Sequence, residues 1–382
     1  GQALMNTAPF AIVLLAAATP AFAQFGKLGD LATKAGKLAT EMNISEQEER
    51  ELGERVSATV RTEFGVVQDP AVTKYVSLLG NLLAKASSRP GLRWEFIVLD
   101  TEGVNAFAAP GGIVHITRGA LGLIKSEAEL AGVLGHEIAH ITKKHTVNAI
   151  QKNKAIKMTT EEVGAKGSAY YSKLANAAYD NIVERGFDRG DEDDADQEGL
   201  RLANKGGYNP AALGSFLGKL MERNKGLSGT KPNGLFSTHP DTQARIDKQS
   251  RQIKSEKLTG TASGQARYAA NVKYDAKPRT AITLSSSEAK GVAGAGSSGS
   301  SAKTEPKPPA KEEKKGGGMF GGLGNALSDG KQKEGQQASA SAGGRALDPN
   351  RPDRYAAGGG NPNKLNVTVT PAEIEAFRKG IA

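Results

Sequence analysis

The sequence predicts a mainly helical α+β fold in which one small β-sheet accompanies several helices. Ser-x-x-Glu capping boxes at 45–48 and 126–129 each mark a helix start, because the paired side chains accept hydrogen bonds from free backbone N–H groups. Two short runs rich in aromatic and β-branched residues, 94–99 and 113–117, have the composition of strands. With the further helices described next, helix signals outnumber strand signals.

Further helices follow from prolines, glycines and caps along the chain. Residues 105–112, between the two strands, contain Asn, Pro and two Gly, and we expect them to form a turn. Residues 169–183 have an irregular apolar pattern, which leaves a lid and a helical hairpin both open. The expected helices span about 45–64, 70–87, 126–141, 191–205 and 209–224, and a last one contains Arg245.

The helix that begins after Ser126 carries the strongest functional signal. Every residue from 130 to 141 is apolar or small except His136, Glu137 and His140, which is the pattern of a helix buried on all sides. Polar groups in such a helix are costly unless each has a strong partner. The histidines are four apart, so both rings project from one face and can bind one tetrahedral metal ion.

This pattern, H-E-x-x-H, is the zincin signature. A structural interpretation competes with it, in which His136 and His140 bind backbone carbonyls in the core and Glu137 is ion-paired. We favour the metal interpretation because the pattern seldom arises by chance inside a buried, capped helix. The chain has no cysteine, so the ligands must be nitrogen and oxygen atoms.

A metal site with two histidines needs a third ligand, and the acidic run 191–196 supplies a candidate. Glu192 and Asp196 are four apart on one helix face, around a small Ala195 that allows close packing on the metal helix. We expect Glu192 to bind the metal and Asp196 to hold a ligand histidine in the right tautomer. The alternative is a solvated helix start, where acidic residues are favoured by the helix dipole.

The N-terminal residues predict export. Residues 10–18 form an apolar core too short to span a bilayer, and Ala21-Phe22-Ala23 fits a small-x-small cleavage site. We therefore interpret residues 1–23 as a removed secretory signal peptide, with a buried helix as the alternative. No other run reaches the length of a membrane span, and we expect a soluble, exported product.

Charge and composition indicate the expected partners and the division of the chain into segments. The net charge is +9, but the basic residues are scattered and lack an aromatic-basic pattern, so nucleic acid is not an expected partner. Residues 285–345, which are rich in Ser, Gly and Lys, cannot bury enough apolar surface to fold. We expect a loose lead-in at 24–44, a main domain at 45–258, an edge-wrapping extension at 259–284, a disordered linker at 285–345 and a tail at 346–382 that docks an envelope partner.

Four motifs in this chain resemble metallopeptidase family forty-eight, which includes HtpX, CAAX prenyl protease and OMA-type zinc peptidases. They are N-A-F-A-A-P-G-G at 105–112, H-E-I-A-H at 136–140, E-D-D-A-D at 192–196 and S-T-H-P at 237–240. The likeness covers roughly residues 45–255, and the motifs stand in the family's order. With an export signal and no membrane-spanning run, the chain is most similar to the soluble periplasmic BepA-like branch.

This resemblance implies a gluzincin-type zinc metallopeptidase domain with a buried H-E-x-x-H helix and a small β-sheet along the cleft. It implies one zinc ion per chain, bound by His136, His140 and Glu192, with Glu137 as the general base. It also implies that His239 acts as a fourth zinc ligand in a resting, self-inhibited state.

The predicted function is zinc-dependent hydrolysis of extended or misfolded polypeptides in the cell envelope, as protein quality control. We expect substrates to bind as an added strand at residues 113–117, with an ordinary edge hairpin as the alternative. Arg245 or His239 is expected to help stabilise the oxyanion. Two other classes stay open: a zinc-containing chaperone or assembly factor whose latent peptidase is inhibited by His239, and a structural metal protein with His239 as a permanent ligand.

Overall fold

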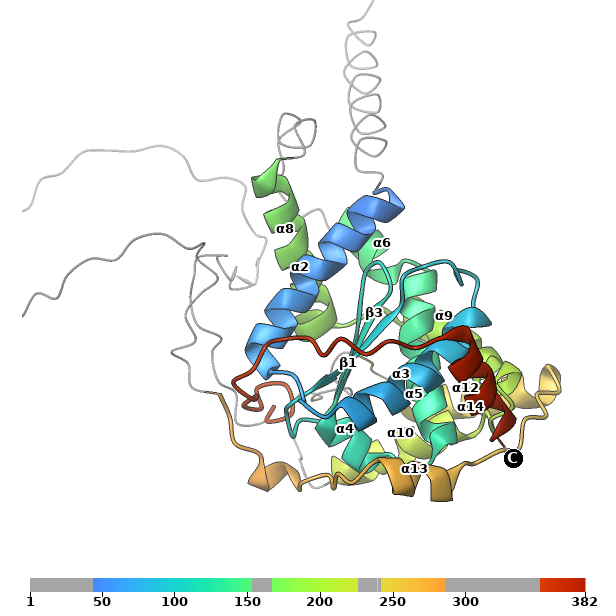
Figure 1. Ribbon diagram of the computed structural model, residues 1–382. Coiled ribbons are helices and arrows are strands. Elements are labelled where there is room, and N and C mark those ends of the chain that lie inside the picture. The colour runs from blue at the N-terminus through green and yellow to red at the C-terminus, as the bar shows by residue number, and fades with distance from the viewer. Residues whose placement is uncertain (1–43, 153–166, 226–238, 240–241, 286–350, 382) are drawn as a thin grey trace, which may run out of the picture. The chain divides into compact units, whose positions relative to one another are not determined.

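A three-stranded sheet and the helices around it form the described part of the molecule (Figure 1). The computed structural model describes residues 44–152, 167–225, 239, 242–285 and 351–381. All of them belong to one unit, which comprises Gly1–Ser285 and Asp348–Ala382. The expectations for the signal peptide, the lead-in and the low-complexity linker fall almost wholly outside the described residues.

The helices agree with the predicted mainly helical α+β class. A π-helix, η1, continues α8 over Asp180–Arg185, and a short 3-10 helix, η2, spans Arg279–Ala281. The α-helices are α2 Glu46–Phe64, α3 Pro70–Lys85, α4 Arg118–Leu123, α5 Glu127–Thr142, α6 His145–Lys152, α8 Ser168–Tyr179, α9 Arg189–Lys205, α10 Ala212–Arg223, α12 Thr242–Ser255, α13 Gln265–Asn271 and α14 Pro371–Lys379.

The sheet has the strand order β1-β3-β2. Its strands are β1 Glu95–Leu99, β2 Ala106–Ala109 and β3 Ile113–Thr117. β3 runs parallel to β1 and antiparallel to β2, so that His115 has a backbone partner on each side. The prediction that a substrate adds as a strand at residues 113–117 is therefore wrong, because both hydrogen-bonding sides of β3 are already occupied.

The predicted turn at 105–112 is also corrected, because half of this stretch, Ala106–Ala109, is the strand β2. The turn is confined to Pro110, Gly111 and Gly112, and the two glycines have φ of 72° and 98°. A Cβ on Gly111 would lie 2.5 Å from the Cα of Arg50, so helix α2 packs directly on this turn. Only glycine combines that backbone conformation with that close approach.

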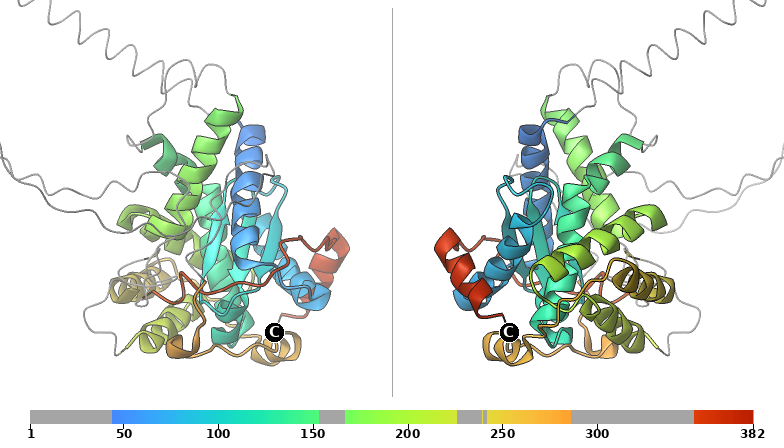
Figure 2. Two further views of the ribbon diagram at one scale, coloured as in Figure 1. Left: turned by 90° about the vertical axis from the view of Figure 1, so that its left-hand side faces the viewer. Right: turned by 90° about the vertical axis from the view of Figure 1, so that its right-hand side faces the viewer.

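The two faces of the sheet are covered by different helices (Figure 2). Alternate strand residues point to opposite faces. Ile97 and Phe107 pack in a core with α2 and α8, whereas Val98 and Val114 pack in a larger core with α3, α5, α9 and α10. The sheet thus separates α2 and α8 from the helices that carry the predicted ligands.

Helix α5 is buried along nearly its whole length, as its composition predicts: every residue from Glu127 to Ile141 is buried. Ser126 caps it by accepting a hydrogen bond from the backbone N–H of Glu129. The reciprocal half of the predicted capping box is not formed. The Glu129 carboxylate instead accepts from the N–H of Lys125 at 2.8 Å and from the Lys219 ammonium at 2.6 Å.

Residues 351–381, which we call the belt, lie across the domain itself (Figure 1). The N–H of Gly359 donates to the carbonyls of Phe64 and Asp100, at 3.0 and 2.8 Å, and helix α14 packs against α3. The belt begins beside the residues that precede the undescribed segment, because the N–H of Ser285 donates to the carbonyl of Tyr355 at 2.9 Å. The part of the predicted docking tail that is described therefore contacts its own domain.

Within the described ranges, no helix is both long and apolar enough to cross a bilayer.

Candidate metal centre

Helix α5 positions the two histidines of the H-E-x-x-H motif side by side. His136 and His140 are 4% and 1% exposed, and their Nε2 atoms lie 3.0 Å apart. One helical turn separates the residues, so both rings leave the same face of the helix. Two imidazole nitrogens therefore converge on one buried point.

Helix α9 crosses α5 closely enough to bring Glu192 to the same point. Its carboxylate oxygens lie 3.4 Å from His140 Nε2 and 3.6 Å from His136 Nε2. The close approach depends on a glycine pair: a Cβ on Gly199 would lie 2.9 Å from the backbone nitrogen of His136, and a Cβ on Gly135 would lie 3.0 Å from the carbonyl oxygen of Gly199. The predicted small-residue packing thus involves these glycines as well as the buried Ala195.

His239 completes the group from the segment before α12. Its Nδ1 lies 2.7 Å from a carboxylate oxygen of Glu192 and 3.1 Å from Nε2 of His136. The potential ligand atoms of His136, His140, Glu192 and His239 all lie within 4.8 Å of one another, and all four residues are buried.

Glu137 lies beside this group with a carboxylate that is 1% exposed. Among the described residues, neither of its oxygens has a hydrogen-bond partner, and the nearest ring nitrogen of His239 is 3.9 Å away. Burial raises the pKa of Glu137 above its ordinary value. A buried carboxylate without a partner is costly. This arrangement suits a carboxylate that accepts a proton from a bound water molecule and later releases it.

Asp196 and Arg245 lie behind the ligand group. An oxygen of Asp196 is 3.0 Å from Nδ1 of His136, and Arg245 donates to both Asp196 oxygens at 2.7 and 2.8 Å. Arg245 also lies 2.9 Å from Glu192. Burial opposes ionisation of Asp196, but the charge and hydrogen bonds of Arg245 outweigh it and hold the pKa of Asp196 well below its ordinary value.

These residues fit a zinc ion. Imidazole nitrogen and carboxylate oxygen are the ligands that zinc takes in the absence of thiolates. Ring nitrogens that face each other at 3.0 Å, with a carboxylate against both rings, are what a shared cation would hold together. Four protein ligands would close the site, whereas three would leave a position for water.

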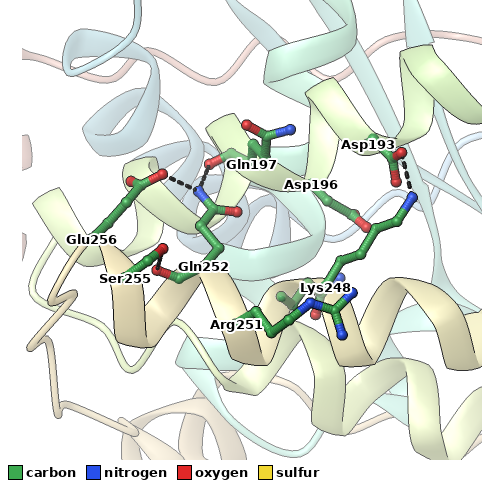
Figure 3. A pocket seen from close by; sticks show the side chains of 9 residues that line it. Asp193, Asp196, Gln197, Lys248, Arg251, Gln252, Ser255 and Glu256 are labelled. Carbon is green, nitrogen blue, oxygen red and sulfur yellow. Dashed lines mark hydrogen bonds and ion pairs between the residues drawn. The ribbon is translucent and has the colours of Figure 1, made fainter.

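A pocket between α9 and α12 does not include this group (Figure 3). Asp196 and Gln249 line it, together with Asp193 and Lys248, which form an ion pair at 2.6 Å. None of the four clustered side chains lines this pocket. We therefore assign the chemistry to the buried group.

The sequence did not single out two neighbours of the site, His145 and Phe187. Nδ1 of His145 lies 2.9 Å from Nδ1 of His140, and the Phe187 ring stacks on His140 with centroids 3.9 Å apart. His145 follows two lysines and precedes a polar segment, so its sequence context resembles a solvated surface. Only its place five residues after the motif was a signal.

Comparison with known proteins decides the family. Residues 70–252 match the family described as "Peptidase family M48", and this segment contains all of the residues named above as potential ligands. Residues 70–252 form an M48 peptidase domain. The resemblance predicted from the four motifs is thereby confirmed.

Several relatives of the M48 domain have names that describe proteases. The chain is 29% identical over 250 residues to a beta-barrel assembly-enhancing protease of Yersinia pestis. This match covers 62% of this chain and 49% of the relative. The chain is also 29% identical over 209 residues to the mitochondrial metalloendopeptidase OMA1 of Schizosaccharomyces pombe, a match that covers 54% of this chain and 61% of the relative. The chain spans about half the length of the beta-barrel assembly-enhancing proteases that it matches.

Proposed function

We propose that the M48 domain is a zinc-dependent endopeptidase that hydrolyses extended or misfolded polypeptides in the cell envelope. His136, His140 and Glu192 would hold the zinc, and Glu137 would act as general base. The observation that carries this proposal is the buried group of potential ligand atoms within 4.8 Å of one another. Beside it lies the carboxylate of Glu137, which has no hydrogen-bond partner among the described residues.

Bound zinc would supply a Lewis acid that lowers the pKa of water and polarises the scissile carbonyl. Glu137 then accepts the proton of the attacking water and delivers it to the leaving amine nitrogen. The raised pKa of Glu137 suits both steps, because a carboxyl group with a pKa nearer to neutrality both accepts and returns a proton more readily.

The sequence predicted that Arg245 or His239 would help to stabilise the oxyanion, but in this proposal Arg245 has another role. Its guanidinium is occupied by Asp196 and Glu192 and by the carbonyl of His239, at 3.2 Å. We assign it to holding these carboxylates in place. Asp196 in turn orients the ring of His136 through Nδ1, which leaves Nε2 for the metal.

We propose β2, rather than β3, as the strand beside which a substrate binds. β2 is an edge strand in the described sheet and packs against α5. The N–H of Thr117, which belongs to β3, donates to the C=O of Asn105, so this carbonyl points towards β3. By antiparallel alternation, the C=O of Ala106 and the N–H of Ala108 point away from β3. An extended polypeptide binds such groups by main-chain hydrogen bonds, which suits substrates without a fixed sequence.

The cell-envelope setting is supported by relatives and by the N-terminal sequence. Several relatives are named for enhancing beta-barrel assembly. The apolar run and cleavage site in residues 1–23 fit an export signal, although those residues lie outside the described part. A periplasmic protease of protein quality control agrees with both.

His239 favours a second candidate, a chaperone or assembly factor whose peptidase is latent. With Nδ1 at 2.7 Å from Glu192 and 3.1 Å from His136, His239 occupies the position of a fourth ligand. Four protein ligands leave no place for the reacting water. A peptidase of this kind would act only after His239 moves away.

The experiment that separates these candidates is hydrolysis of casein, an unfolded protein, by the purified chain with and without a chelator. The parent protein is compared with Glu137→Gln, which keeps the ligands but removes the base, and with His239→Ala, which opens the fourth position. Zinc content is measured for each protein.

We expect the chelator and Glu137→Gln to abolish cleavage, and His239→Ala to increase it, with one zinc bound per chain. Full activity of Glu137→Gln would reject the assigned base. Cleavage by His239→Ala alone, with zinc bound in all three proteins, would favour the latent peptidase of a chaperone.

A further inference from the structure

His145 contacts the metal centre from outside the H-E-x-x-H motif. It is the first residue of α6, is 4% exposed, and its Nδ1 lies 2.9 Å from Nδ1 of His140. The two rings meet edge to face, with centroids 5.0 Å apart. Because Nε2 of His140 faces His136 and Glu192, His145 occupies the opposite side of the ring.

The turn between α5 and α6 is built to bring His145 back onto this ring. Lys144 has φ of 57°, in the left-handed region that non-glycine residues rarely adopt. Such a conformation persists only where its surroundings stabilise it. Here the Lys144 ammonium lies 3.3 Å from the buried carboxylate of Glu49, and the side chain of Asn148 donates to the carbonyl of Lys143.

Zinc binding at Nε2 of His140 would determine where the protons of this contact lie. A histidine that binds a metal through Nε2 must carry its proton on Nδ1. Nδ1 of His140 can then donate to Nδ1 of His145 only if that atom is unprotonated, so the proton of His145 lies on Nε2. That Nε2 atom is 3.7 Å from the carboxylate of Asp191, which favours a proton on that side.

We infer that His145 is a positioning residue that holds His140 in the tautomer and orientation needed to bind the metal. Each motif histidine then has its own outer partner: Asp196 for His136, at 3.0 Å, and His145 for His140, at 2.9 Å. This inference rests on the proposed zinc site. It adds a residue that is not part of the H-E-x-x-H motif.

A pair of substitutions separates the hydrogen bond from the packing of the ring. His145→Asn places a side-chain oxygen near the position of Nδ1 and keeps the acceptor, whereas His145→Phe keeps an aromatic ring and removes the acceptor. His145→Leu is a second variant without an acceptor, for use should the Phe variant not fold. Circular dichroism and thermal unfolding of the metal-free proteins show which variants are folded.

The readouts are zinc affinity, measured by competition with a chromogenic chelator, and the visible spectrum of the cobalt-loaded protein. We expect His145→Phe to bind zinc about 10- to 100-fold more weakly, the usual effect of losing an outer partner of a ligand, and to shift the cobalt spectrum. His145→Asn should bind zinc nearly as tightly as the parent and keep the spectrum.

Two results would overturn the inference: a folded Phe variant that binds zinc as tightly as the parent, or an Asn variant that binds as weakly as Phe. A parent protein that binds no zinc would reject the proposed function itself. The two failures are therefore distinguishable.

Discussion

Asp196 contacts two buried groups at once, the ring of His136 and the guanidinium of Arg245. Removing one partner of a buried ion pair destabilises a protein by about 3–5 kcal/mol. Losing the outer partner of a metal ligand lowers metal affinity about 10- to 100-fold. We therefore expect Asp196→Asn to lower both quantities, measured by urea unfolding of the metal-free protein and by zinc competition with a chelator.

Asp193→Asn is the matched control on the same helix. Its side chain is 30% exposed and pairs with Lys248 at 2.6 Å, and surface pairs of this kind contribute about 0.2–1 kcal/mol. The control should keep zinc affinity and lose little stability. Similar losses in both variants would contradict the role assigned to Asp196.

His115 makes the stability of the fold depend on pH. Burial, aided by the charge of Arg61, lowers the pKa of His115 from 6.5 to about 3. As pH falls below about 6.5 the unfolded chain takes up a proton that the folded chain does not, so the free energy of unfolding falls by about 1.4 kcal/mol per pH unit until about pH 3. Above this window His115 contributes no pH dependence.

His115→Gln tests this dependence without a titrating group. We expect the stability that the metal-free protein loses between pH 7 and pH 5 to be smaller in this variant by about 2 kcal/mol. Urea unfolding at the two pH values measures the difference. Equal losses in parent and variant would mean that His115 keeps its ordinary pKa in the folded protein.

At the scale of elements, the contact between α5 and α9 determines whether the ligands meet. A methyl group on Gly199 would lie 2.9 Å from the backbone nitrogen of His136, so the two helices must separate to admit it. Overpacking of this kind typically destabilises by about 1–3 kcal/mol. We expect Gly199→Ala to lower both stability and zinc affinity, because Glu192 moves with α9.

Gly218→Ala is the control, since Gly218 lies within α10 and a Cβ there would meet no atom of the described residues within 4 Å. Glycine in the middle of a helix is less favourable than alanine by about 0.5–1 kcal/mol. The control should therefore gain stability and keep zinc affinity. Should Gly199→Ala bind zinc like the parent, the close helix contact would not be what places Glu192.

Local signals predicted the helices well. α3 begins at Pro70, and α9 ends at Lys205 before two glycines, because caps, prolines and glycines act within one turn. Strand order has no local signal: it depends on which distant segments pair. For that reason we predicted the strand 113–117 at an edge, although β3 is central. We also missed β2, because it lies in a stretch of small and turn-forming residues.

In the site too, contacts that follow from local spacing could be predicted, whereas contacts that depend on the path of the chain could not. Regular helical spacing predicted that His136 and His140 share a face and that Glu192 and Asp196 share another, and the structure brings these faces together. His145 was not predictable, because it returns to His140 through a left-handed turn at Lys144. A lysine gives no sign of that conformation, whereas a glycine or asparagine would have done so.

At the scale of the whole molecule, the belt at 351–381 contributes to the core. Tyr355, Ala356 and Ile374 are buried, and the buried Asp353 pairs with Arg223 at 2.6 Å. Burying one large apolar side chain contributes about 1.5–3 kcal/mol. We expect deletion of residues 348–382 to lower the free energy of unfolding by more than about 3 kcal/mol, measured in urea.

The control keeps the belt and replaces residues 286–347 by a short Gly-Ser linker. Because the N–H of Ser285 already donates to the carbonyl of Tyr355, a short connection spans the gap without moving either end. This variant should keep the stability of the parent. If it lost as much as the deletion, the contribution would come from residues 286–347 and not from the belt.

The meeting of Ser285 with Tyr355, and the bridge between Leu284 and Ala356, have a consequence for proteolysis. A cut anywhere between residues 286 and 350 would divide the chain without breaking any of these contacts. The product would be a non-covalent pair of fragments that migrates as two bands in a denaturing gel and elutes as one particle under native conditions. Such a nicked form would keep all four clustered residues of the candidate metal centre on its larger fragment.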